Sequence, residues 1–144
     1  MDTYKSNEET VYCNIDTVYA KLSNPECFRT LIENENIPAD MKQRMAGVEF
    51  TSDSIAFNAD PVGKVVLQIV ERTQPTKIAM AATSFPLPFR AEINLEKVAD
   101  NETKLFVEFK IELNIMLRAM AAKPLGDGVK KMAQMLAMLP YDRL

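Results

Sequence analysis

The sequence predicts an α+β domain in which an antiparallel sheet is covered on one face by a C-terminal helix. Two observations support this fold class. Between residues 47 and 113, apolar and polar residues alternate with a period of two, and turn-forming residues interrupt the alternation. Before and after this region, apolar residues recur at steps of three and four, which is the spacing of an amphipathic helix.

The composition indicates one globular domain spanning residues 1–144. With 144 residues, 47% of them apolar, the chain can bury one sizeable core. The net charge of −3, with both signs interspersed, offers no basic face, so nucleic acid is not an expected partner. No apolar run approaches the roughly 20 residues that cross a bilayer, so membrane insertion is not expected. The N-terminus lacks a signal-peptide pattern, which favours a cytoplasmic location.

The cysteine and histidine content excludes several kinds of chemistry. Cys13 and Cys27 are expected to be reduced, half-buried thiols in a strand and a helix. The chain has no histidine, which removes Cys-His and Ser-His-Asp catalysis and most zinc sites. Because it also lacks a phosphate loop, a CxxC pair and metal-ligand spacing, we expect no metal and no cofactor. Whether the protein catalyses any reaction stays open, and these absences favour a protein that is not an enzyme.

The first third of the chain predicts a strand followed by two short helices. Residues 3–13 suit an extended strand, and helical spacing follows from Ile15, with Asn14 or Asp16 as the cap. Pro25 ends the first helix, because the residue before a proline disfavours the helical conformation. A second short helix follows, and residues 37–47 could add another helical turn. The inward residues of the two helices are Ile15, Val18, Tyr19, Leu22, Phe28, Leu31 and Ile32.

The period-two region predicts a six-strand antiparallel meander with one dry and one wet face. Turns are expected at Ser52-Asp53, "DPVG", "TQPT", "FPLP" and "DNET". The inward positions are Val65, Leu67 and Ile69, then Phe89, Ala91, Ile93 and Leu95, then Leu105, Val107, Phe109, Ile111 and Leu113.

The C-terminal segment predicts the helix that covers the dry face, since such a face must be buried against something. The regular spacing begins after Pro124, which suits a first helical turn. Gly126 and Gly128 should make the entry to this helix adaptable. Its inner face consists of Val129, Met132, Ala133, Leu136 and Leu139.

The segment "NIDTVYAKLSNPECF" resembles the opening of the START-related helix-grip superfamily (SRPBCC), which includes birch-pollen-allergen-like and polyketide cyclase/dehydrase-like proteins. Tyr19 stands where tryptophan is commoner in that superfamily. The resemblance implies a helix-grip fold: a curved seven-stranded antiparallel sheet wrapped around a long C-terminal helix, with two short helices after strand 1. It also implies, in many members, an apolar cavity for a lipid, sterol, polyketide or similar molecule. It carries over no catalytic residues. The matching positions are Val18, Tyr19, Leu22, Ser23, Asn24, Pro25 and Phe28.

The expected ligand-binding residues are apolar and come from the strands, one hairpin tip and the final helix. Methionine is prominent because its flexible thioether adapts to ligands of several shapes. The hairpin tip and the Met-rich residues 115–128 would form a mouth with a movable side. Alternatively, the methionines are plain core, as expected for Met138, and the tip packs on a loop or on a second copy, which leaves a homodimer open. The set is Leu67, Ile69, Met80, Phe85, Leu87, Phe89, Ile93, Phe109, Met116, Met120 and Met132.

Four polar residues are candidates near this cavity. The first strand has two possible registers. In one, Tyr12 faces inward and Glu8 does too. In the other, Val11 and Cys13 face inward, and neither Glu8 nor Tyr12 does. Arg118 could meet a carboxylate head group beside the mouth. Strict alternation from Val65 directs Glu71 inward at the far rim, where solvent would reach it.

Three functions remain open on the sequence. The leading one is binding of a small hydrophobic molecule in the apolar cavity, as carrier, buffer or sensor. The second is a cyclase- or dehydratase-like enzyme that moves a proton with Glu8 or Tyr12. The third is a protein-interaction module with a collapsed cavity.

Overall fold

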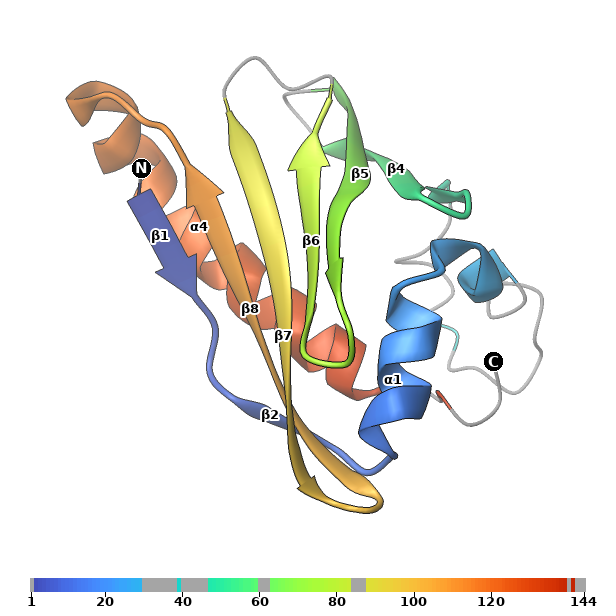
Figure 1. Cartoon of the computed structure of the whole chain (residues 1–144). Helices are drawn as coiled ribbons and strands as arrows, with labels where there is room; N and C mark the ends of the chain where they lie inside the picture. The colour runs from blue at the N-terminus through green and yellow to red at the C-terminus, as the bar shows by residue number, and fades with distance from the viewer. Residues whose placement is uncertain are drawn as a thin grey trace.

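The computed structural model describes residues 2–29, 39, 47–59, 63–83, 88–139 and 141 (Figure 1). Residues 31–32 and most of residues 37–47, expected to be helical, lie outside the described part. The elements are β1 (Asp2–Lys5), β2 (Glu9–Val11), α1 (Ile15–Leu22), η1 (Pro25–Phe28), β3 (Glu49–Phe50), β4 (Ser54–Ala59), β5 (Gly63–Thr73), β6 (Lys77–Ala82), β7 (Phe89–Ala99), β8 (Glu102–Ile111) and α4 (Ile115–Ala137).

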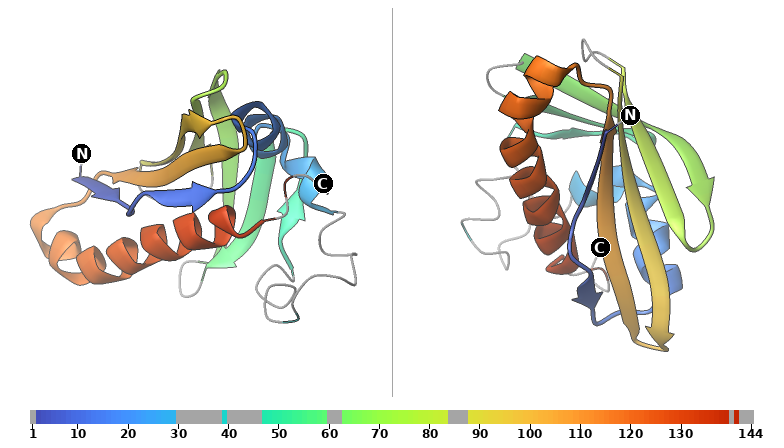
Figure 2. Two further views of the ribbon diagram at one scale, coloured as in Figure 1. Left: turned by 90° about the horizontal axis from the view of Figure 1, so that it is seen from below. Right: turned by 90° about the vertical axis from the view of Figure 1, so that its left-hand side faces the viewer.

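One antiparallel sheet holds the strands of the described residues, in the order β1-β8-β7-β6-β5-β4-β3, with β2 also paired to β8. The helix α4 runs along one face and contacts β8, β1 and β2 (Figures 1 and 2). α1 closes one end of that face, and its apolar residues belong to the same buried cluster as those of β6, β7 and α4. This α+β arrangement confirms the predicted helix-grip fold.

The predicted first strand is split into β1 and β2 by a buried serine. The register moves from Lys5 opposite Glu108 to Glu9 opposite Leu105, so one extra residue is accommodated between them. The N–H of Ser6 donates to Val107 O at 2.8 Å, and Ser6 Oγ accepts from the N–H of Val107 at 2.8 Å. The hydroxyl thus takes the place of a ladder carbonyl, and the broken strand stays bonded to β8.

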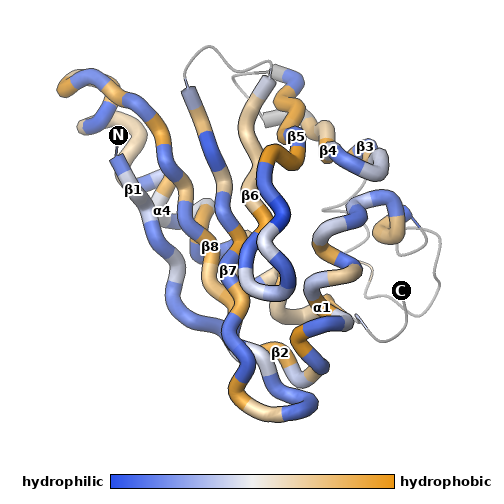
Figure 3. Tube along the Cα trace, in the orientation of Figure 1, coloured by the Kyte–Doolittle hydropathy of each residue, from blue (hydrophilic) through white to orange (hydrophobic). Residues whose placement is uncertain are grey.

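The alternation of apolar and polar residues predicted for β7 and β8 is visible along the chain trace (Figure 3). The burial pattern of both strands confirms that their apolar positions form the dry inner face. Ile93 lies opposite Val107, and Leu95 opposite Leu105, with all four side chains buried. The helical spacing of α1 is confirmed as well, and its cap is Asn14, whose side chain accepts from Asp16 N.

A bulge in β5 reverses the expected direction of Glu71. Ile69 pairs with Met80, but Glu71 pairs with Ala79, so Val70 is the extra residue. Beyond the bulge, the inward and outward positions are exchanged. The prediction that Glu71 faces inward is therefore wrong: it lies on the outer face, where its carboxylate meets Arg90 at 2.8 Å.

The helix α4 starts nine residues before the predicted start. It begins at Ile115, with the side chain of Asn114 accepting from Leu117 N at 2.8 Å, and continues through Pro124. Proline was expected in the first turn because it lacks an N–H. Within α4, that missing N–H would have bonded the carbonyl of Met120, which lies in an exposed part of the helix where water can reach it.

Candidate ligand-binding interior

The described β5–β7 residues expected to line a cavity lie together on the inner face of the sheet. Leu67 and Ile69 on β5, Met80 on β6 and Ile93 on β7 are all buried in one apolar cluster. Cross-strand pairing brings them side by side, since Ile69 lies opposite Met80. The prediction that these residues face inward is therefore confirmed.

The interior is fully closed at the end where α1 packs. Ile78 on β6, Leu105 on β8 and Val18 on α1 have no exposed surface. The last part of the chain seals the same end, because the buried Tyr141 donates its hydroxyl to Leu136 O at 2.6 Å. Burial raises the pKa of this phenol, which keeps it protonated as a donor.

At the opposite end, the inner face is lined by half-buried apolar residues. The rings of Phe89 and Phe109 lie 5.2 Å apart between their centroids, and both pack against the buried cluster. Gly128 of α4 lies over this pair, since a Cβ there would be 3.9 Å from Phe109 Cε2. Met132, one turn further along α4, is also half-buried against the cluster. Because Phe89, Phe109, Gly128 and Met132 are all partly exposed, this is the half-closed end of the inner face.

Three methionines are not where the sequence analysis placed them. Met116 and Met120 are 75% and 72% exposed, because the first turns of α4 extend beyond the sheet, so they do not line the interior. Met138 is 68% exposed, which makes the expectation of a core residue wrong: it is the C-cap of α4, past the last buried helical position. Phe85 and Leu87 lie outside the described residues.

Of the two registers considered for the first strand, the structure has the one in which Val11 faces the interior. Val11 is buried and Tyr12 is 82% exposed, so the inward-facing prediction for Tyr12 and Glu8 is wrong. The carboxylate of Glu8 lies 3.5 Å from Lys104 Nζ at the surface. Arg118 does not face the interior either, since its Nε donates to Asp2 Oδ2 at 2.8 Å.

The sequence analysis did not identify Glu92, a buried carboxylate on the outer face of the sheet. The side chain of Glu92 is only 4% exposed, and it contacts Arg90 at 2.7 Å, Lys110 at 3.0 Å and Lys77 at 3.3 Å. Burial would raise the pKa of Glu92, but hydrogen bonds from the three cations lower it below its usual value. In the sequence Glu92 is one of four alternating polar residues, and only the strand registers bring Lys77 and Lys110 next to it.

The stability of the protein should therefore fall in acid. A carboxylate with a lowered folded-state pKa stabilises the fold above its ordinary value of 4.5, and this contribution is lost as the pH falls through the folded-state pKa. Thermal melts between pH 7 and pH 3 should show a decline that begins below about pH 5. A variant with glutamine at position 92 should show a smaller decline, and an equal decline would contradict this assignment.

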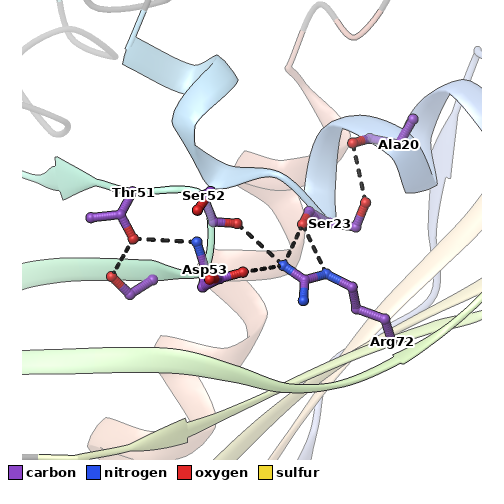
Figure 4. A network of polar contacts seen from close by, with 7 residues as sticks. Ala20, Ser23, Thr51, Ser52, Asp53 and Arg72 are labelled. Atoms are coloured by element: carbon purple, nitrogen blue, oxygen red, sulfur yellow. Dashed lines mark hydrogen bonds and ion pairs between the residues drawn. The ribbon is translucent and has the colours of Figure 1, made fainter.

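A second polar network joins α1 to the β3–β4 turn (Figure 4). Because of the bulge in β5, Arg72 lies opposite Ile78 on the inner side of the sheet. Its guanidinium donates to Ser23 O at 3.0 and 3.1 Å, to Ser52 O at 3.2 Å and to Asp53 Oδ1 at 2.8 Å. These hydrogen bonds tie the end of α1 and the β3–β4 turn to β5.

Both cysteines are half-buried thiols, as predicted, but Cys13 follows the end of β2 and is not in a strand. Burial raises the pKa of Cys27, whose thiol donates to Lys21 O at 3.3 Å, which disfavours the reactive thiolate. Among the described residues, no three acidic or cysteine side chains lie close enough together to hold a metal ion.

A small hollow of about 110 Å³ lies at the other edge of the sheet. Ligand pockets usually have about 300–1,000 Å³. Two residues that line the hollow, Lys64 and Glu49, form an ion pair at 3.5 Å, and the hollow is distinct from the interior under α4. We do not consider it a ligand site. Its lining residues are Gly47, Glu49, Ala56, Phe57 and Lys64.

In the part of the chain that the structure describes, no helix has both the length and the apolar character needed to cross a bilayer.

Comparison with known proteins identifies the fold. No family model matches the chain, and no curated protein sequence does. Norcoclaurine synthase from Thalictrum flavum, solved with dopamine and hydroxybenzaldehyde, has a TM-score of 0.69 at 9% identity over 99% of this chain and 88% of its own. An NMR structure of a protein from Thermobifida fusca has a TM-score of 0.63 at 17% identity, covering 100% of this chain and 95% of its own.

A START superfamily protein from Mycobacterium smegmatis also matches, with a TM-score of 0.51 at 11% identity over 90% of this chain and 98% of its own. At these identities the likeness concerns the fold alone. The chain therefore has the helix-grip fold of the START-related proteins, as the resemblance at residues 14–28 predicted.

Proposed function

We propose that this protein binds a small hydrophobic molecule between the inner face of the sheet and α4, as a carrier, buffer or sensor. The observation that supports this most directly is the change in burial along the inner face. Apolar side chains are sealed at the α1 end, whereas Phe89, Phe109 and Met132 at the other end are half-buried. An apolar surface that is continuous with the core and reachable from one end suits an apolar ligand.

The fold comparison supports the same proposal. The structure of norcoclaurine synthase was solved with dopamine and hydroxybenzaldehyde, so that protein accommodates small aromatic molecules. In the present chain, the two aromatic rings and the flexible thioether at the half-closed end could pack against a ligand of similar size.

The residues proposed for an enzymatic role lend no support to catalysis in the interior. Glu8 and Tyr12 face the solvent. Glu92 and Glu71 lie on the outer face of the sheet, each paired with Arg90. Binding is therefore the function that the positions of these residues favour.

Replacement of Met132 by lysine should abolish binding of a hydrophobic probe. Met132 packs against the buried cluster, so a charge there would have to be desolvated when an apolar ligand binds. The measurement is fluorescence titration of the native protein with Nile red, an uncharged hydrophobic dye, at neutral pH, where we expect at least a tenfold loss of affinity for Met132→Lys.

Met120→Lys is the matched control, because it introduces the same charge into an exposed position of the same helix. It should bind the probe as the wild type does, and so should Met138→Leu. Thermal melts of each variant would check that it is folded. Wild-type protein that binds no probe would refute the proposal, and equal loss in Met120→Lys and Met132→Lys would place the bound probe on the surface of α4 instead.

A further inference from the structure

We infer that the first part of α4 is a hinged arm that controls access to the interior, held closed by an ion pair between Arg118 and Asp2. The arm is residues 115–123, and the hinge is residues 124–128. The control of ligand access rests on the proposed binding function, whereas the existence of the hinge does not.

The arm is held far less by packing than the rest of the helix. Eight of its nine residues are exposed, and none is buried, whereas Val129, Ala133 and Leu136 in the second half of α4 are buried in the core. Figure 1 shows the first turns of α4 projecting past the start of β1. Few buried contacts mean that this part of the helix can move at a lower free-energy cost than the part that follows.

The hinge lies at the boundary between these two parts. Pro124 lacks the N–H that would bond Met120 O, and Gly126 and Gly128 lower helical stability within the next turn. These three residues occur together where burial begins, so the helix is weakest where the arm leaves the sheet.

The ion pair is placed where it can hold the arm against the half-closed end. Arg118 Nε donates to Asp2 Oδ2 at 2.8 Å. Asp2 lies opposite Ile111 on β8, and Ile111 lies opposite Phe89 on β7. The contact between α4 and β1 is therefore in the same row of the sheet as the half-buried Phe89, beside the half-closed end of the inner face.

Arg118→Gln should release the arm without changing the interior. Exposed ion pairs contribute little, so we expect the amides of residues 115–123 to exchange about two- to fivefold faster by hydrogen-exchange mass spectrometry. Stopped-flow binding of uncharged Nile red should show association and dissociation rates that both rise by about the same factor, with an unchanged Kd.

Lys104→Gln is the matched control, since it removes a surface ion pair on β8 that does not involve α4. It should change neither the exchange of residues 115–123 nor the binding rates. Gly126→Ala should act in the opposite direction and slow both rates. A Cβ at position 126 meets nothing within 4 Å, so this variant should fold and leave the half-closed end unchanged.

The outcomes separate this inference from the proposed function. If the amides of residues 115–123 exchange at the same rate in Arg118→Gln and in Lys104→Gln, the ion pair does not hold the arm and the inference is wrong. If exchange rises but the binding rates do not, the arm moves without controlling access, which also overturns the inference. Wild-type protein that binds no probe while Arg118→Gln still accelerates exchange would contradict the proposed function and support the hinge.

Discussion

Replacement of Glu92 by glutamine should lower the free energy of unfolding by about 2–3 kcal/mol, because it leaves three cations around a buried amide. The carboxylate is 4% exposed and contacts Arg90, Lys110 and Lys77. Breaking a fully buried pair typically costs 3–5 kcal/mol, and the smaller value follows because solvent partly reaches the three cations. Urea unfolding at pH 7 would measure the change.

Glu96→Gln provides the control for this prediction. Glu96 is on the same strand and the same face as Glu92, but it is exposed. The same substitution there should change stability by no more than about 0.5 kcal/mol. Equal effects at the two positions would show that burial among the cations contributes nothing.

Replacement of Pro124 by alanine should stabilise the protein by up to about 3 kcal/mol, the difference between the two residues within a helix. Pro124 is the tenth residue of α4 and is exposed, so alanine restores the N–H and creates no cavity. The midpoint of urea unfolding should rise, and helical circular dichroism should increase slightly.

Lys123→Ala is the control for the effect of helix propensity at an exposed neighbouring position, and it should change stability by only a few tenths of a kcal/mol. An unchanged midpoint for Pro124→Ala would contradict the prediction. Such a result would mean that the arm unfolds separately from the rest of the helix.

Some parts of the candidate interior could be predicted because their determinants are local. A strand alternates its side chains between two faces, so the spacing of Leu67, Ile69 and Ile93 was enough to place them inward. The helical spacing of Val129, Ala133 and Leu136 identified the face of α4 that meets the sheet in the same way.

Other parts could not be predicted because one extra residue reverses every position that follows it. The bulge at Val70 moves Glu71 to the outer face and Arg72 to the inner side, and the break at Ser6 decides the register of β2. Strict alternation has no means of locating such an insertion, because the decisive hydrogen bond at Ser6 is made to Val107, 101 residues away.

The sequence by itself determined the α+β class, the dry face of the sheet and the inner face of the final helix, since each depends on periodicity within one segment. Only the tertiary structure decided which part of each apolar face is buried and which part stays exposed. Met120 and Met132 have the same side chain on one helix, yet one is exposed and the other packs on the core, because the buried positions of α4 begin only at Val129. Likewise, Glu92 is buried because Lys77 and Lys110 reach it from neighbouring strands, and the pairing of those strands is a property of the whole fold.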